Sequence, residues 1–359
     1  MARDPVKLSL DGRVEWADNY LRAAQFQRPK WIPCSVGLLP ATWKKYRQEL
    51  EDLALEHPRI FRGYKRGSRD FDNLGDITYA AKEYTDAWGC RWENLAPGMV
   101  GQVAEHPLAD WEAFETYQPP DLMQMTDLGQ PRDWDAIARG LQRTAEHGGL
   151  RWGGGLHHGF MWMRLYYLRG FEDLMIDIAT ADPRLDRLID VVLEQNMRVI
   201  ERYLELGAEL MSFGDDLGNQ DALPISPRHW RQYLGPCYRR MYGACREAGA
   251  HVYMHSDGHL IPIIGDLIEA GVTIINPQIR ANGLENLVRE CKGRVCVNLD
   301  LDRQLFPFTT PAGIDAHIRE AIEALGSDEG GLMLGAECAP DVPLDNIRAI
   351  CEAFERYCF

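Results

Sequence analysis

Apolar and polar positions follow one repeated order in the second half of the chain. An amphipathic stretch with helical spacing ends at a glycine, a short run of apolar residues follows, and polar residues come next. This order occurs at residues 206–216, 248–257 and 270–278, and in a looser form at 330–338. The glycine is typical of a helix C-terminus, and a short run that is apolar on both faces is typical of a buried parallel strand. The pattern therefore predicts an α/β fold in which helices alternate with parallel strands.

Helical segments between these strands have recognisable beginnings. Residues 183–206 carry apolar side chains at every third or fourth position, as an amphipathic helix does. Ser226–Pro227 and Thr310–Pro311 are typical helix starts, because the hydroxyl caps the first turn and proline fits its first position. We expect a final helix at residues 342–357 and one more strand at residues 293–300.

The alternation of units with short links favours a (β/α)8 barrel or a doubly wound parallel sheet. The first half of the chain must supply the remaining strands. Residues 31–36 and 152–156 are the best candidates, whereas residues 60–120 give no clear pattern. No linker or change of composition marks a boundary. We therefore expect a single domain over residues 1–359, with an N-terminal extension of about 25 residues.

Polar side chains follow each expected strand. In a barrel, the carboxyl ends of all strands open at one mouth, where active sites lie, so we expect these side chains to converge. They are His157, His158, Asp215, Asp216, Asn219, Gln220, His255, Asp257, Asn276, Gln278, Asn298, Asp300, Glu337 and Cys338. The prediction is a polar, acidic cavity with several groups that can bind a metal.

His255 and Asp257 form the most informative pair of the chain. Residues at i and i+2 of a strand point the same way. Their spacing suits two ligands of one metal ion, or an acid/base pair, and the residues alone leave both open. Cys338 or its neighbour Glu337 is the expected third ligand, and the alternative for Cys338 is a buried thiol. A zinc site of histidine, cysteine and carboxylate with one open position would act as a Lewis acid.

Further candidates lie at neighbouring strand ends. Asp215 and Asp216 are adjacent and must diverge, so one should face the cavity while the other caps a helix or pairs with a cation. Both are candidate catalytic residues, as are His157 and Tyr167, although Tyr167 equally fits core packing. The expected substrate- or cofactor-binding residues are His158, Asn219, Gln220 and Gln278.

The composition narrows the possible partners and locations. A formal net charge of −15 argues against nucleic acid or an anionic membrane surface as a partner. No run of about 18 apolar residues and no secretory signal is visible, so a cytoplasmic location is the default expectation. Nine cysteines without a CxxC pair indicate free thiols in a reducing compartment.

Four segments of the chain resemble the uroporphyrinogen decarboxylase superfamily. The resemblance extends over roughly residues 85–357. Its most specific parts are residues 159–170, 255–261, 269–277 and 338–347. This superfamily includes zinc-dependent methyltransferases that move methyl groups between a corrinoid protein and a thiol or folate acceptor. The resemblance implies a (β/α)8 TIM barrel, in agreement with the pattern of helices and strands.

The chain departs from both branches of this superfamily. The decarboxylase clamps the carboxylates of its tetrapyrrole with N-terminal arginines, and residues 28–37 hold no matching pair, although Tyr167 matches that enzyme's site tyrosine. The methyltransferases bind zinc through His-x-Cys and a distant cysteine. Asp257 stands in place of the first cysteine, and Ala336 aligns with the second. A shift of two residues preserves the facing of a strand, so Cys338 or its neighbour Glu337 takes that role in our prediction.

The resemblance implies a methyltransferase that acts with a separate corrinoid protein, as in O-demethylation. Zinc would be held by His255, Asp257 and either Glu337 or Cys338. A small-molecule methyl donor or acceptor completes the reaction, and the family suggests a homodimer. Two alternatives stay open: a metal-independent decarboxylase or lyase that uses His255 and Asp257 as an acid/base pair, and a non-catalytic binder of a corrinoid or tetrapyrrole.

Overall fold

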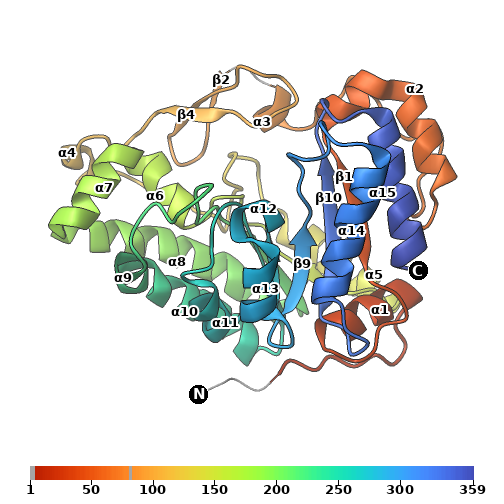
Figure 1. Cartoon of the computed structure of the whole chain (residues 1–359). Helices are drawn as coiled ribbons and strands as arrows, with labels where there is room; N and C mark the ends of the chain where they lie inside the picture. Colours follow the sequence, from red (N-terminus) through yellow and green to blue (C-terminus); the bar gives the residue numbers. More distant parts are fainter. Residues whose placement is uncertain (1–4, 81–82) are drawn as a thin grey trace. The chain divides into compact units, whose positions relative to one another are not determined.

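The structure, a computed structural model, describes residues 5–80 and 83–359 (Figure 1). The described residues fall into two compact units. Unit 1 takes its residues from Met1–Leu21, Thr85–Trp92 and Val103–Asn276, and unit 2 takes them from Arg22–Tyr84, Glu93–Gln102 and Pro277–Phe359. The expectation of one domain stays a prediction, and each unit is described by itself below.

Unit 1 is built on parallel strands. Strands β5 (Trp152–Gly153), β6 (Leu210–Gly214) and β7 (His251–Ser256) pair in parallel in that order, with Gly214 opposite His255. Strand β8 (Ile274–Pro277) follows β7, and the backbone N–H of Thr273 donates to the carbonyl oxygen of Val252 at 3.0 Å. The strands expected around residues 210, 252 and 275 are therefore confirmed.

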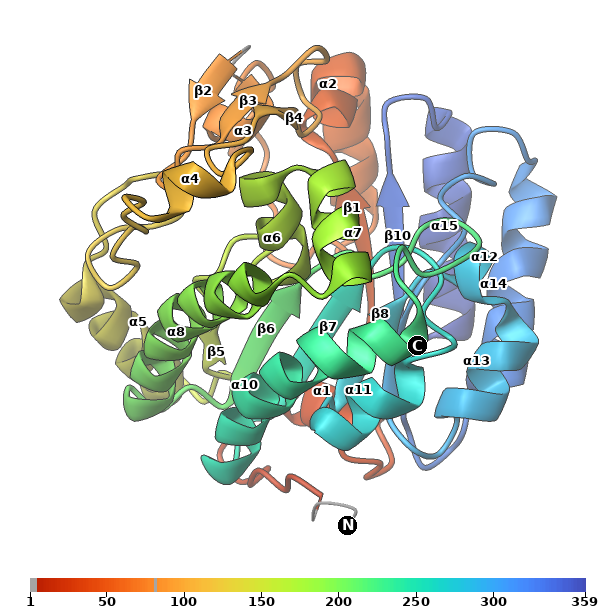
Figure 2. The ribbon, with the colours of Figure 1, turned by 90° about the vertical axis from the view of Figure 1, so that its left-hand side faces the viewer.

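Helices cover these strands. Figure 2 shows α8 and α10 lying along β6 and β7. Helix α8 starts as predicted, since Asp182 caps the backbone N–H of Arg184 and Pro183 fills the first position, and its buried face carries Leu185 and Leu188. The helices of unit 1 are α4 (Trp111–Phe114), α5 (Trp134–Glu146), α6 (Trp162–Arg169), α7 (Phe171–Thr180), α8 (Pro183–Glu205), α9 (Pro227–His229), the π-helical turn η1 (Trp230–Leu234), α10 (Gly235–Glu247) and α11 (Ile264–Ala270).

Glycines end the helices that precede the strands, as the sequence pattern predicts. Gly207 follows α8 with φ 83° and Gly249 follows α10 with φ 76°. Both values lie in the left-handed region that glycine adopts without steric cost, so the chain can turn directly into β6 and β7.

Unit 2 has the same construction. Strands β1 (Cys34–Leu38), β10 (Leu332–Cys338) and β9 (Cys296–Asp300) pair in parallel in that order. Thr310 caps the N–H of Gly313, which confirms the predicted start of α14. The helices of unit 2 are α2 (Pro40–Glu56), α3 (Ile77–Ala80), α12 (Ile279–Asn282), α13 (Leu284–Cys291), α14 (Pro311–Leu325) and α15 (Leu344–Tyr357). The α/β class with parallel strands is confirmed, and closure into an eight-stranded barrel stays a prediction.

Several elements lie where the chain passes from one unit to the other. They are α1 (Glu15–Ala24), β2 (Glu83–Thr85), β3 (Arg91–Glu93), β4 (Gln102–Glu105) and β8. The strands β2 to β4 fall in residues 60–120, where no pattern is visible in the sequence, because strands of three or four residues are too short to show a period.

Three expected strands differ from the observed ones. The strand expected at residues 31–36 begins at Cys34, the strand expected at 152–156 ends at Gly153, and the strand expected at 293–300 begins at Cys296. In the second case Gly155 has φ +72°, which ends the extended conformation.

All nine cysteines carry free thiols in the part of the chain that the structure describes. Among the same residues, every helix is too short or too polar to cross a membrane.

Candidate metal centre

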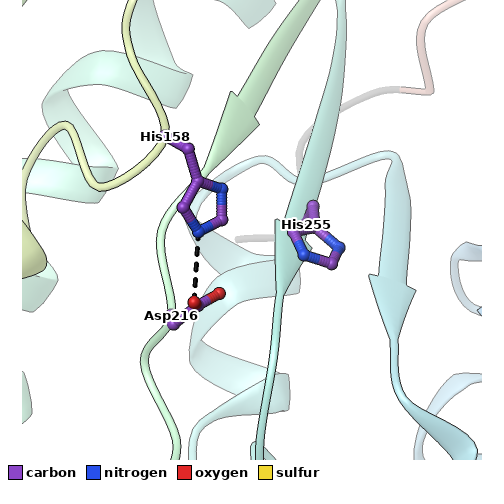
Figure 3. Close-up of side chains that lie close together, drawn as sticks. All are labelled: His158, Asp216 and His255. Atoms are coloured by element: carbon purple, nitrogen blue, oxygen red, sulfur yellow. Dashed lines mark ion pairs between the residues drawn. The ribbon is translucent and has the colours of Figure 1, made fainter. Parts of the chain in front are cut away.

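Three side chains of unit 1 form a cluster with the chemistry of a metal site. His158, Asp216 and His255 each bring one possible ligand atom, and these atoms lie within 4.8 Å of one another (Figure 3). His158 Nε2 lies 3.1 Å from Asp216 Oδ2. Two imidazole nitrogens and one carboxylate oxygen fit a divalent transition metal, and three protein ligands leave positions open for a substrate.

The strand ends bring the cluster together. His158 follows β5, Asp216 follows β6, and His255 lies near the end of β7. Gly214 leaves room for the ring of His158, because a Cβ at Gly214 would lie 2.6 Å from His158 Nδ1. The backbone also holds this arrangement, since the N–H of Gly159 donates to the carbonyl oxygen of Gly214 at 2.8 Å.

A close contact between two loops positions the carboxylates. The backbone N–H of Asp257 donates to Asp216 Oδ1 at 2.9 Å, and the N–H of His259 donates to the carbonyl oxygen of Asn219 at 2.8 Å. A Cβ at Gly258, where φ is +82°, would overlap the carbonyl oxygen of Gly218. We call this contact between residues 214–219 and 256–259 the loop clasp. It explains why both loops carry a glycine directly beside their polar residues.

His255 is held on both sides of its ring. Its Nδ1 lies 2.7 Å from Asn276 Oδ1, and its Nε2 lies 3.4 Å from Asp257 Oδ1. Asn276 is in β8 and is buried. The expectation that His255 and Asp257 point the same way agrees with this geometry.

The neighbouring carboxylates favour the protonated form of both histidines. Burial lowers the pKa of His255, but the hydrogen bond to Asp257 and the charges of Asp257 and Asp216 outweigh it and raise the pKa to about 9. Burial lowers the pKa of His158, but the hydrogen bond and the charge of Asp216 outweigh burial, so the pKa of His158 is raised. A metal binds only neutral imidazole, so metal binding here is expected to release protons and to weaken at acid pH.

Asp215 has a different task from Asp216. It is completely buried, and it accepts hydrogen bonds from the backbone N–H groups of Trp162 (2.6 Å) and Met163 (3.0 Å) at the start of α6. Tyr238 Oη donates to the same carboxylate at 2.6 Å. Burial raises the pKa of Asp215 above its ordinary value, although these donors oppose the rise. Of the two adjacent acids, one therefore faces the cluster and the other caps a helix, as the alternation along the chain predicts.

The remaining candidates of unit 1 lie outside the three-residue cluster. The ring Nδ1 of His157 lies 2.9 Å from the carbonyl oxygen of His158. The ring of Tyr167 packs edge-on against Trp92, and burial raises the pKa of the Tyr167 phenol. Asn219 takes part in the loop clasp through its backbone, and the side chains of Asn219 and Gln220 are exposed. The roles assigned to these four residues stay predictions.

Of the side chains expected at the strand ends, five belong to unit 2: Gln278, Asn298, Asp300, Glu337 and Cys338. Gln278 forms a parallel bridge with Asp300. Glu337 Oε1 lies 2.8 Å from Arg303 Nη1, while the thiol of Cys338 is completely buried. Burial raises the pKa of Cys338, and Cys351 of α15 raises it further. Glu337 and Cys338 thus point to opposite sides of β10, and Cys338 lies on the side of α15.

Sequence reasoning missed part of the site. It expected His158, Asp216 and His255 at one mouth as strand-end residues but did not name the three as ligands of one metal ion, because ligands from three different strands have no common spacing. It also gave no role to Tyr238 in α10, whose only signal is that buried tyrosines need a hydrogen-bond partner.

Comparison with known proteins identifies the family of this chain and a solved structure with a similar fold. The sequence profile of the family described as uroporphyrinogen decarboxylase (URO-D) matches residues 95–357. No curated protein sequence matches the chain significantly.

Among solved structures, a methyltransferase from Methanosarcina mazei has a TM-score of 0.60 at 19% sequence identity, over 95% of this chain and 98% of that one. At this identity the likeness shows the fold alone. Two further solved structures match with TM-scores below 0.5. A 3-keto-D-glucoside 4-epimerase from E. coli has a TM-score of 0.38 at 14% identity, over 71% of this chain and 96% of that one. A B12-independent methionine synthase from Shewanella sp. W3-18-1 has a TM-score of 0.40 at 12% identity, over 64% of this chain and 68% of that one.

Proposed function

Because the chain belongs to the uroporphyrinogen decarboxylase family, we propose that it is a metal-assisted methyltransferase of that family. In this proposal it moves a methyl group between a corrinoid, supplied by a separate protein, and a small acceptor such as a thiol or tetrahydrofolate. A solved structure that shares this fold over almost the whole chain is a methyltransferase, and for that reason we propose this branch and not decarboxylation. We also propose that the strands of the two units belong to one (β/α)8 barrel, as the family resemblance implies.

The observation that carries the proposal is the cluster of His158, Asp216 and His255. Its ligand atoms suit zinc or a similar divalent metal. A bound metal would supply a Lewis acid that lowers the pKa of an acceptor thiol, so that the thiolate is available at neutral pH.

The chain's own residues would prepare that acceptor. The backbone N–H of Asp257 and the ring of His158 orient the carboxylate of Asp216. The carboxylate of Asp257, 3.4 Å from His255 Nε2, is placed to accept the proton that the acceptor loses.

Glu337 and Cys338 stay proposed contributors to metal binding, and so does Asp257 in the alternative that its carboxylate binds the metal and does not take the proton. The methyltransferases that the chain resembles bind zinc through a histidine and two thiolates, and this chain has Asp257 in place of one thiolate. Of the two candidates in β10, we favour Glu337, because Cys338 would have to leave a completely buried position.

A methyl-transfer assay tests the proposal. Metal-loaded protein would be mixed anaerobically with methylcobalamin and either a thiol or tetrahydrofolate, and loss of the methylcobalamin spectrum would be followed. In the reaction the acceptor thiolate takes the methyl group. The electron pair of the carbon–cobalt bond stays on cobalt, which gives cob(I)alamin. We expect turnover with one acceptor class that His255→Ala abolishes.

One observation favours a second candidate, a lyase that works without metal. His255 and Asp257 lie 3.4 Å apart, and the raised pKa of about 9 keeps His255 protonated at neutral pH. A protonated histidine beside a carboxylate suits acid/base work on a small carboxylic acid. Release of carbon dioxide that is insensitive to a chelator, with no methyl transfer, would favour this lyase over the methyltransferase.

A further inference from the structure

Two hydrogen-bond donors meet at the side-chain oxygen of Asn276. His255 Nδ1 lies 2.7 Å from this oxygen, and Tyr253 Oη lies 2.8 Å from it. We propose that Asn276 is a positioning residue that holds His255 as the Nδ1–H tautomer, with the lone pair of Nε2 presented to a metal. This inference rests on the proposed metal centre and adds a claim about the imidazole itself.

The chemistry of the amide group sets the tautomer. An amide oxygen can only accept hydrogen bonds, so its 2.7 Å contact with His255 Nδ1 is favourable when Nδ1 carries the proton. A neutral imidazole has one N–H, and its second nitrogen then keeps a lone pair. In His255 that second nitrogen is Nε2, whose contact with Asp257 Oδ1 is longer, at 3.4 Å, so the proton lost at high pH is expected to leave from Nε2 and not from Nδ1.

The surroundings of Asn276 keep its oxygen in this orientation. Tyr253 and His255 are two residues apart on β7, so both donors lie on the same face of that strand. The phenol occupies the second acceptor position of the Asn276 oxygen, and the residue is only 8% exposed. An amide turned by half a rotation would place its NH₂ group against both donors.

Partners of this kind are common around metals. The nitrogen of a ligand histidine that does not bind the metal usually donates to an oxygen, and loss of that oxygen typically weakens metal binding about 10–100-fold. Asn276 has this relation to His255.

The test compares Asn276→Ala with Asn276→Asp, which restores an oxygen acceptor at the same place. Thr273→Val is the matched control. Thr273, the residue before β8, also contacts β7, because its Oγ1 accepts from the N–H of Val252 at 2.9 Å, and it does not touch His255. Two readouts are used. The ¹⁵N shifts of the His255 ring are measured in metal-free protein at a pH above its pKa, and Co²⁺ affinity is measured by competition with a chelator.

We expect Asn276→Ala to lose the Nδ1–H preference and to bind Co²⁺ about 10–100-fold more weakly. Asn276→Asp should keep the tautomer and most of the affinity, and Thr273→Val should change neither readout. Circular dichroism checks that each variant is folded.

An unchanged tautomer in Asn276→Ala would overturn the inference, and so would an Asn276→Asp variant that loses as much affinity as the alanine variant. A wild type that binds no Co²⁺ would instead count against the proposed metal centre. The nitrogen shifts would still decide the claim about Asn276.

Discussion

Asp215 and Asp216 are neighbours in the sequence but meet opposite environments. Asp215 is completely buried and satisfies N–H groups at the start of α6, whereas the side chain of Asp216 is 26% exposed and faces His158. The alternation of side chains along an extended backbone separates the two carboxylates. One acid therefore supports the fold, and the other is available for chemistry.

This separation predicts different outcomes for two similar substitutions. Asp215→Asn places an amide N–H₂ against several donors, so we expect the free energy of unfolding to fall by about 2–4 kcal/mol. Asp216→Asn removes a charged ligand at a partly exposed site, so we expect it to lose metal while its stability changes by less than about 1 kcal/mol.

Chemical denaturation and metal analysis of the two asparagine variants check this prediction. The assignment of roles would be wrong if Asp216→Asn were the less stable variant and still bound metal as the wild type does.

The loop clasp is the feature that matters at the level of elements. It joins the loop after β6 to the loop after β7. The N–H of Asp257 donates to the side chain of Asp216, and the N–H of His259 donates to the backbone carbonyl oxygen of Asn219, so the distance between Asp216 and Asp257 is fixed. Because the contact is made by backbone atoms of Gly218 and Gly258, no larger residue fits there without moving a loop.

Gly258→Ala should therefore be far more harmful than an alanine at another glycine of similar φ. Gly249 is the matched control, with φ +76° and no heavy atom within 4 Å of an added Cβ. We expect Gly249→Ala to cost about 1 kcal/mol of stability through its backbone conformation alone. We expect Gly258→Ala to cost clearly more and to weaken metal binding. Equal stability and equal metal affinity in the two variants would show that the clasp does not position the site.

For the whole molecule, the sequence predicts the local pattern better than the assembled site. The alternation of helix, glycine and apolar strand is a local signal, and it located β6, β7, β9, β10 and their neighbouring helices correctly. Strand β5 was shorter than expected, because glycines end it, and β2 to β4 are too short to show a period.

The site could be predicted only in part, for a physical reason. His255 lies in a strand that is followed by polar residues, so the sequence alone indicates that it is a candidate site residue. The short distances from His255 to His158 and Asp216 depend on which strands pair, and strand pairing cannot be determined from a single sequence. The sequence also did not show which way Cys338 faces, since the burial of its thiol depends on the packing of the folded chain.

The metal content of the purified protein tests the central claim most directly. Elemental analysis would be made on wild type purified without added metal, and again after loading with zinc and dialysis, beside His158→Ala, His255→Ala and the control His157→Ala. The proposed centre predicts stoichiometric metal in the wild type and in His157→Ala, and its loss in both of the other variants. A folded wild type that retains no metal after loading, or a His158→Ala variant that retains it fully, would contradict the proposed centre.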